Sequence, residues 1–213
     1  LIRTDLLESW RNRLPEGTPN YFLINIQPDE VSALNSFLQE RAELSADIYP
    51  MIRGRLVAIN DKAVSSDDYT DQRAQRLVNR EFNLSIAENM QADNRLEAGV
   101  WWSESETDAV FSVEEGIAES LGIALNDSLT YSIGGLEVTG RVSNLRWVEW
   151  DSFRVNFFVI ANPGTLDHYP ATFITSFFLP ADNRHLLNDL VKAFPSVTVF
   201  DIDALLSQVR IIM

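Results

Sequence analysis

Two strand–helix–strand patterns, one near each end of the chain, constrain the fold more than any other feature. In the N-terminal pattern, the aromatic and β-branched run Tyr21–Ile26 is typical of a strand. Pro28 fits the first turn of a helix, and apolar residues then recur at helical spacing at Val31, Leu34, Phe37 and Leu38. A second extended stretch is predicted over residues 47–60.

The C-terminal pattern has the same order. Residues 171–179 form an apolar run that Pro180 ends, Asp182 is suited to cap a helix with one apolar face, and 197–200 are typical of another strand. Two such units side by side predict an α+β fold, a split βαβ, ferredoxin-like sheet with its helices on one face. Residues 1–60 and 165–213 should build this sheet together.

The stretch between the two patterns, residues 61–164, is predicted to be a smaller inserted β-rich subdomain. The acidity of the chain is concentrated there. Residues 61–127 hold 15 acidic and 5 basic residues, a net charge of −10, whereas 1–60 and 128–213 each carry −2. This change of charge supports a boundary near residue 60.

Local patterns predict the elements of the insert. Residues 61–75 are polar and indicate a surface loop, and Ser112–Glu115 is typical of a capping box that begins a short helix. Gly134–Gly135 predicts a tight hairpin turn. A shift in apolar parity after Ser143 predicts a β-bulge, and residues 153–159 predict a further strand.

Composition excludes several classes of protein. The net charge of the 213 residues is −14, which argues against a nucleic-acid or anionic-membrane surface, since both require clustered basic residues. The chain has no cysteine, so disulfides, zinc fingers, iron–sulfur clusters and thiol catalysis are excluded.

No catalytic, cofactor-binding or metal-binding residue is predicted. The chain lacks a G-x-S-x-G motif and both glycine-rich phosphate-binding patterns, and its two histidines, His168 and His185, fall in a loop and on a helix surface. The aspartates between 61 and 71 lack the spacing of a calcium loop. A hydrolase using paired carboxylates stays an alternative because the chain has 31 acidic residues, although no pair stands out.

Four tryptophans of the insert are candidates for contact with a partner or substrate: Trp101, Trp102, Trp147 and Trp150. Two interpretations are open. They form the core of a small β-rich subdomain, or some face outward as a contact surface. Adjacent residues of an extended strand point to opposite faces, so one of Trp101 and Trp102 should be exposed if that segment is extended.

Both ends of the chain are apolar, with Leu1–Ile2 at the start and Ile211–Met213 at the end. One interpretation is a processed N-terminus and an ordinary terminal helix. The other is a loop excised between two membrane helices, with nearby arginines at the headgroup level. In that case the final helix, with Leu205 and Leu206, should pack against the N-terminal segment around Trp10.

Several short segments between Gly99 and Gly164 carry a family resemblance. They are GVWW (99–102), VEEGIA (113–118), LGI (121–123), VSNLR (142–146), WDSF (150–153) and NFF (156–158). Together they resemble the extracytoplasmic domains of FtsX-like ABC transporter permeases, in particular the YbbP group, whose loops also open with patterns like 5–10 and 19–25. Five residues in the most specific block are expected to be structural: Arg146, Asp151, Phe153, Asn156 and Phe157.

The resemblance implies a MacB-like periplasmic domain of a bacterial inner-membrane protein, with a porter-like subdomain built from both ends and a smaller inserted subdomain. It implies a non-catalytic role in mechanotransmission, in which a separate cytoplasmic ABC ATPase subunit moves the flanking membrane helices and hence this domain. The implied partners are that ATPase, through the parent permease, and a periplasmic protein or lipid-like substrate. The membrane would be contacted through flanking helices outside this chain, with no cofactor and no nucleic acid.

A free-standing ferredoxin-like module that binds a ligand or acts as a sensor is the alternative function. The continuous insert and the apolar ends argue against it. Residues that flank this chain would separate the two, because membrane helices need about 20 apolar residues on each side.

Overall fold

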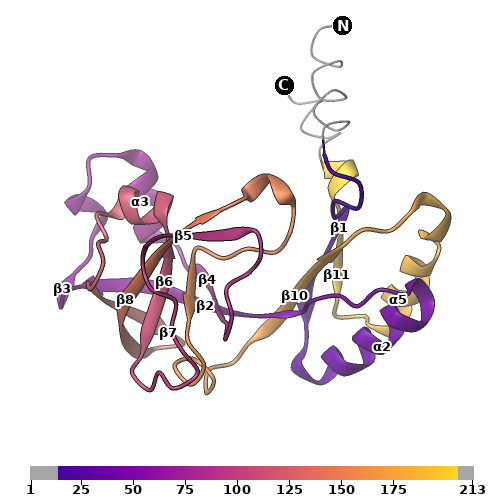
Figure 1. The fold of residues 1–213 in the computed structure, drawn as a ribbon, viewed down its shortest axis with the longest axis horizontal. Helices are drawn as coiled ribbons and strands as arrows, with labels where there is room; N and C mark the ends of the chain where they lie inside the picture. The colour runs from indigo at the N-terminus through magenta and orange to yellow at the C-terminus, as the bar shows by residue number, and fades with distance from the viewer. Residues whose placement is uncertain (1–13, 206–213) are drawn as a thin grey trace, which may run out of the picture. The chain divides into compact units, whose positions relative to one another are not determined.

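The computed structural model describes residues 14–205, which form two compact units (Figure 1). Unit 1 contains the chain up to Ile48, the short segment Trp150–Val155 and the chain from Phe173 onward. Unit 2 contains Tyr49–Glu149 and Asn156–Thr172. The sequence pattern grouped residues 49–60 and 165–172 with the outer sheet, whereas the contacts group them with the insert. The mixed α+β class expected from the sequence is confirmed.

Unit 1 is a three-stranded antiparallel sheet with two α-helices on one side (Figure 1). The strand β1 lies in the middle, with β10 and β11 beside it. The elements of unit 1, including three 3₁₀ turns, are β1 (Tyr21–Ile26), η1 (Pro28–Glu30), α2 (Val31–Ala42), η3 (Trp150–Ser152), β10 (Thr172–Phe177), η4 (Ala181–Asn183), α5 (Leu186–Ala193) and β11 (Thr198–Asp201). A split βαβ fold has four strands, and the fourth predicted strand is grouped with unit 2. The ferredoxin-like assignment therefore remains a prediction.

The core of unit 1 follows from its periodicity. Tyr21 and Leu23 of β1, together with Ile26 beyond a register shift in the strand, are buried in one core with Leu34 and Leu38 of α2 and the apolar side of α5. Helical spacing in the sequence predicts the apolar sides of α2 and α5, and burying each large apolar side chain is worth about 1.5–3 kcal/mol.

The start of β1 and the end of β11 lie side by side. Tyr21 is paired with Asp201, and the backbone N–H of Ile202 donates to the carbonyl of Asn20 at 2.9 Å. Arg184 packs over the Tyr21 ring, 5.9 Å from its centroid. The chain therefore enters and leaves the sheet of unit 1 at the same end.

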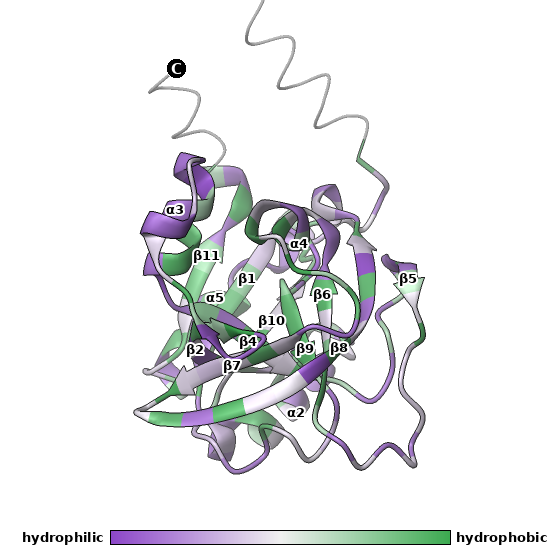
Figure 2. Cartoon of the chain, turned by 90° about the vertical axis from the view of Figure 1, so that its left-hand side faces the viewer, coloured by the Kyte–Doolittle hydropathy of each residue, from purple (hydrophilic) through white to green (hydrophobic). Residues whose placement is uncertain are grey.

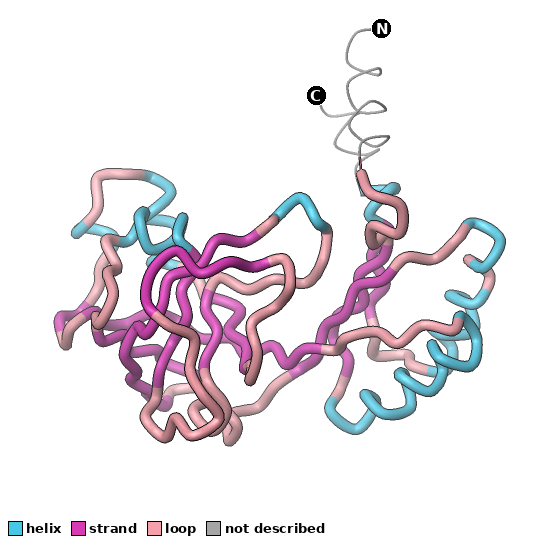
Figure 3. The backbone as a smooth tube through the Cα atoms, viewed as in Figure 1, coloured by secondary structure: helices cyan, strands magenta, loops and turns pink. Residues whose placement is uncertain are grey.

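Unit 2 is built around a closed six-stranded barrel. Going around the ring, β2 pairs with β4, β4 with β9, β9 with β6, β6 with β8, β8 with β7, and β7 again with β2. The pairings β4–β9 and β6–β8 are parallel and the others antiparallel. Figure 3 shows these strands together in magenta. Closure removes the exposed strand edges that open sheets must protect.

The β8 strand is long enough to pair with a strand outside the barrel as well as with barrel strands. Its first half pairs with β7, and its second half pairs with β5, which lies outside the barrel. The elements of unit 2 are β2 (Tyr49–Ile59), β3 (Lys62–Ala63), η2 (Ser66–Asp68), α3 (Gln72–Asn79), β4 (Phe82–Ile86), β5 (Asn94–Gly99), β6 (Val110–Glu114), α4 (Glu115–Leu121), β7 (Ser128–Ile133), β8 (Leu136–Val148) and β9 (Val159–Ala161).

Two local predictions for unit 2 are confirmed. Gly134 and Gly135, both with positive φ, form the turn between β7 and β8. The register of β6 against β8 jumps from Val142 to Asn144, which leaves Ser143 as the extra residue of a bulge. The bulge changes which side chains of β8 face the barrel interior, and so turns Asn144 and Arg146 to its outer side.

Three local predictions are wrong. Residues 153–158 are not a strand, and only Val159–Ala161 join the barrel. The predicted polar loop 61–75 runs into the helix α3, whose start is capped by Asp71 and whose buried side the sequence analysis missed. Ser112 does not cap α4, because it lies within β6 and Glu114 occupies the cap position.

No helix among residues 14–205 is long and apolar enough to cross a membrane. The expected packing of Leu206 against the segment around Trp10 lies outside the described residues.

Candidate functional site

The most unusual buried group of unit 2 is the guanidinium of Arg146 on β8, which has no exposed surface. Its Nε donates to Ser112 Oγ on β6 at 2.8 Å, and its Nη1 donates to Asn94 Oδ1 on β5 at 2.9 Å. Its Nη2 donates to the backbone carbonyl of Phe157. One side chain therefore joins three strands to the segment that precedes β9.

A second layer of polar groups holds the acceptors of Arg146 in place. Ser112 Oγ donates to Asn144 Oδ1, and Asn94 Nδ2 donates to Asn156 Oδ1 at 2.7 Å. Asn156 Nδ2 in turn donates to Asp93 Oδ2 at 2.7 Å. Because unpaired buried polar groups are costly, each member of this Arg146 network depends on the others.

Burial lowers the pKa of Arg146 to about 10, since a charged group is disfavoured away from water. The negative charges of Glu114 and Asp93 act in the opposite direction and favour the charged form. Glu114 is itself engaged, because its carboxylate accepts the backbone N–H groups of Gly116 at 2.8 Å and Ile117 at 2.9 Å at the start of α4. Arg146 therefore remains a cation at neutral pH.

The Arg146 network is suited to holding strands together rather than to chemistry on a substrate. Its arginine donors are directed at protein acceptors, and the side chain reaches no surface. Arg146, Asn156 and Phe157 of the sequence motif meet here.

Two other motif residues lie apart from the network. Asp151 is exposed in the 3₁₀ turn η3 (Trp150–Ser152). Phe153 follows with a φ of +56°, a left-handed conformation that is strained for a large aromatic residue. This backbone turn is the physical reason why 153–158 cannot be a strand.

Trp101 and Trp102 form a stacked pair, and the condition for their pointing to opposite faces, an extended segment, is not met. Their ring centroids are 4.0 Å apart, because the segment after β5 is not extended as a strand. The indole N–H of Trp101 donates to the carbonyl of Glu88 at 2.8 Å, and that of Trp102 to the carbonyl of Ala87 at 3.0 Å. The pair therefore fastens the loop after β4 to the loop after β5.

The other two candidate tryptophans differ in exposure. Trp147 is half-buried on β8, with the guanidinium carbon of Arg95 4.5 Å from its ring centroid. Trp150 is 45% exposed, compared with 7% for Trp102. Of the four tryptophans, Trp150 thus offers the largest accessible fraction for contact with another molecule.

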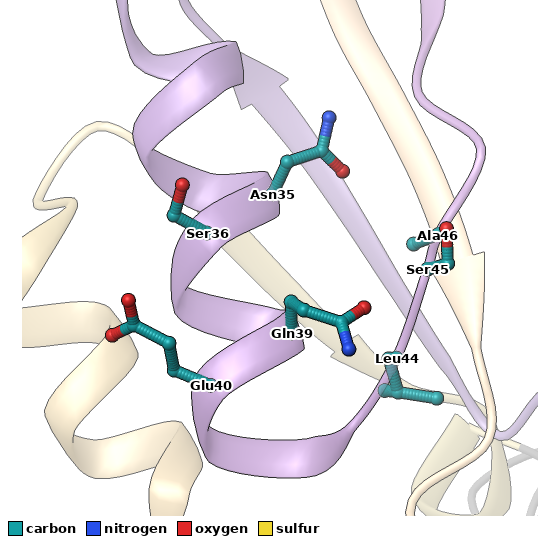
Figure 4. Close-up of a pocket in the computed structure, with 7 residues that line it drawn as sticks. All are labelled: Asn35, Ser36, Gln39, Glu40, Leu44, Ser45 and Ala46. Atoms are coloured by element: carbon teal, nitrogen blue, oxygen red, sulfur yellow. The ribbon is translucent and has the colours of Figure 1, made fainter.

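A shallow hollow of about 390 Å³ lies on unit 1, between α2 and the segment that follows it (Figure 4). Asn35, Gln39 and Glu40 line it from the helix, and Ser45 and Ala46 from the other side. Apart from Ala46 these groups are polar and exposed, and among the lining residues there is no histidine or cysteine.

The sequence analysis missed Asp93, Asn94, Ser112 and Asn144 as partners of Arg146. The alternation of Asn144 and Arg146 on β8 was the available signal, since two polar residues of the same parity suggest a shared polar face. Their partners come from distant parts of the chain, which no local pattern could join.

No protein-family model matches the chain, but comparison with known proteins gives a homologue. The chain is 39% identical over 209 residues to the ABC transporter permease YbbP of Escherichia coli (strain K12), described as uncharacterized. This match covers 98% of the chain and 25% of YbbP, so the chain spans about a quarter of that relative's length. The resemblance to the YbbP group is confirmed.

A solved domain of a protein from Porphyromonas gingivalis, described as a permease, is also similar. It shares 12% sequence identity, with a TM-score of 0.43, over 85% of this chain and 89% of that one.

Proposed function

We propose that this homologue of one segment of an ABC transporter permease is a non-catalytic periplasmic domain. It would engage a periplasmic partner or an amphiphilic substrate and would be coupled to ATP hydrolysis by a cytoplasmic ABC ATPase. The observation that carries the proposal is the 39% identity over 98% of the chain to a permease of which it spans 25%.

The geometry of unit 1 supports this role. Because β1 begins where β11 ends, segments that continue from these strands would leave the sheet at the same end. A loop between two membrane helices needs this arrangement, since both helices must meet the same membrane surface. Movement of the two helices together would then be passed to one small sheet.

The Arg146 network supports a mechanical rather than a catalytic part for unit 2. A closed barrel in which a buried guanidinium joins β6 and β8 to the neighbouring strand β5 should keep its shape when the segments around it move.

Trp150, in the short segment of unit 1 between β8 and β9, is the residue that we assign to partner contact, because it combines 45% exposure with a large apolar ring.

The location can be tested in cells because the chain has no cysteine. Val100 is 72% exposed, so a Val100→Cys change in the full-length permease adds an accessible thiol to this domain, and the permease without the change measures labelling of any cysteine elsewhere. We expect a membrane-impermeant maleimide to label it in intact cells with a permeable outer membrane. As a matched control, Leu34→Cys is fully buried and should stay unlabelled.

Labelling of Val100→Cys only after the inner membrane is disrupted would contradict a periplasmic location. The gene sequence on each side of the codons for Leu1 and Met213 gives a second test. Polar flanks on both sides would contradict the permease role and favour the free-standing sensor module.

A further inference from the structure

Four arginines of unit 2 gather where the outer face of β2 meets the C-terminal end of α3. We call them the arginine surface: Arg53, Arg55, Arg76 and Arg80. All four side chains are exposed. They stand out in a chain with 31 acidic and 17 basic residues, and Figure 2 shows α3 as a strongly hydrophilic segment.

The strand and the helix bring these arginines together. Arg53 and Arg55 alternate along β2 with buried residues, so both project from the outer face of the barrel. The Nη2 of Arg55 lies 3.5 Å from the carbonyl oxygen of Asn79, the last residue of α3. Arg76 lies in the last turn of that helix, and Arg80 follows Asn79 directly.

None of the four arginines forms an ion pair within 4.0 Å with any residue between 14 and 205. Glu81, which lies between Arg80 and the first residue of β4, is not paired with them. Three arginines elsewhere in the described residues do have such partners: Arg41 at 2.7 Å, Arg95 at 3.2 Å and Arg184 at 3.6 Å.

Stabilisation of the helix dipole explains only part of this surface. A cation near a helix C-terminus is favourable, which accounts for Arg76 and for Arg55 beside the Asn79 carbonyl. Arg53 lies two residues before Arg55 on β2. The guanidinium carbon of Arg80 lies 5.9 Å from the ring centroid of Phe82. Neither has a partner that explains its charge.

We propose that the arginine surface binds the phosphate headgroups of an anionic lipid bilayer. Guanidinium groups present paired N–H donors that match phosphate oxygens. The net charge of −14 does not prevent this, because at physiological salt charges beyond about 8 Å are screened and the local arginines dominate. The proposed surface would be a local exception to the prediction, made from net charge, that the chain does not bind an anionic membrane.

A lipid surface fits better than an acidic protein. Stable protein interfaces are centred on buried aromatic or aliphatic anchors. No large apolar side chain within residues 49–83 is strongly exposed, although Leu136, which is 66% exposed, lies across β7 from β2. An electrostatic surface without apolar anchors is typical of headgroup binding.

The test is sedimentation of the full chain with vesicles of phosphatidylglycerol and phosphatidylcholine, compared with phosphatidylcholine alone. We expect binding only to the anionic vesicles, weaker at 300 mM than at 50 mM salt. The double variant Arg53→Gln/Arg76→Gln leaves the Arg55 contact intact and should weaken binding roughly 25-fold, at about fivefold per arginine. The control Arg95→Gln/Arg141→Gln has the same charge and should bind as the original protein does.

Several outcomes would overturn the proposal. One is the absence of binding to anionic vesicles at 50 mM salt, and another is an equal loss in both double variants. Binding of soluble polyglutamate in place of vesicles would assign the surface to an acidic protein. Circular dichroism of each variant verifies that the fold is retained. The permease role does not depend on this result, since cell labelling tests it separately.

Discussion

Unit 2 comes almost entirely from one continuous stretch of chain, whereas unit 1 is assembled from two distant ones. All six barrel strands lie between Tyr49 and Ala161. In unit 1, β1 and α2 precede this stretch, and β10, α5 and β11 follow it. Unit 2 can therefore close without unit 1, but the sheet of unit 1 needs both ends of the chain.

This difference has an energetic consequence. Pairing β1 with β10 closes a loop of about 150 residues, and the entropy cost of such a closure grows with loop length. A folded unit 2 shortens the effective loop and lowers that cost. Damage to unit 1 should thus stay local, whereas damage to unit 2 should spread to unit 1.

The largest expected effect is that of Leu34→Asp in unit 1. Leu34 is fully buried in the core of α2 and the sheet, and an unpaired charge there should cost about 5 kcal/mol. We expect unit 1 to lose its helical signal in circular dichroism. Fluorescence of Trp101, Trp102 and Trp147 should still show the unfolding transition of unit 2.

The neighbouring change Asn35→Asp is the control, since Asn35 is exposed and gains the same charge. It should change stability by less than about 0.5 kcal/mol. If Leu34→Asp removes the tryptophan transition as well, the two units do not fold independently. Residues 49–172 expressed alone give a further test and should unfold cooperatively.

Arg146→Met tests the opposite case, in which destabilisation of unit 2 should also unfold unit 1. It leaves Asn94 Oδ1, Ser112 Oγ and the Phe157 carbonyl without their buried donor, which should cost about 4 kcal/mol. The tryptophan transition in urea should move to lower concentration, and the helical signal of unit 1 should be lost with it. Arg141→Met, an exposed position on the same strand, is the control and should have little effect.

Periodicity predicted unit 1 better than unit 2, for a physical reason. The buried sides of β1 and α2 are apolar, so residues such as Leu23, Leu34 and Leu38 can be recognised from the sequence alone. In unit 2 the bulge at Ser143 was visible as a shift in apolar parity, but the Arg146 network joins residues as far apart as Asn94 and Phe157, which no local pattern connects. Closure of a barrel likewise depends on which strands pair, and strand propensity does not carry that information.

Two tryptophans, Trp102 of unit 2 and Trp150 of unit 1, test on a smaller scale whether the exposure of a side chain predicts the cost of removing it. Trp102 is 7% exposed, and its indole N–H fastens the loop after β4, so Trp102→Ala should cost about 3 kcal/mol. Trp150→Ala, at a site that is 45% exposed, should cost less than about 1 kcal/mol. Urea unfolding followed by circular dichroism measures both. Equal losses would show that exposure does not separate the structural tryptophans from the one assigned to partner contact.

The smallest expected effect concerns the response of unit 2 to alkali. Burial raises the pKa of Tyr131 well above its ordinary value near 10, since its ring is packed against Phe111 and Phe82. A group with a raised pKa in the folded state contributes stability below pH 10 and loses it as the pH rises. At pH 11 the loss should be about 1.4 kcal/mol, because the unfolded tyrosine ionises and the folded one does not.

Tyr131→Phe keeps the ring contacts and removes the ionisable group, so it isolates this contribution. Tyr21 and Tyr69 also have raised pKa values, and the lowered pKa of Arg146 acts in the opposite direction above pH 10. These groups are present in both proteins and cancel in the difference between them. We therefore expect the difference in unfolding free energy to shift by about 1.4 kcal/mol in favour of Tyr131→Phe between pH 8 and pH 11. Parallel pH profiles would mean that the Tyr131 hydroxyl ionises as readily in the folded barrel as in the unfolded chain.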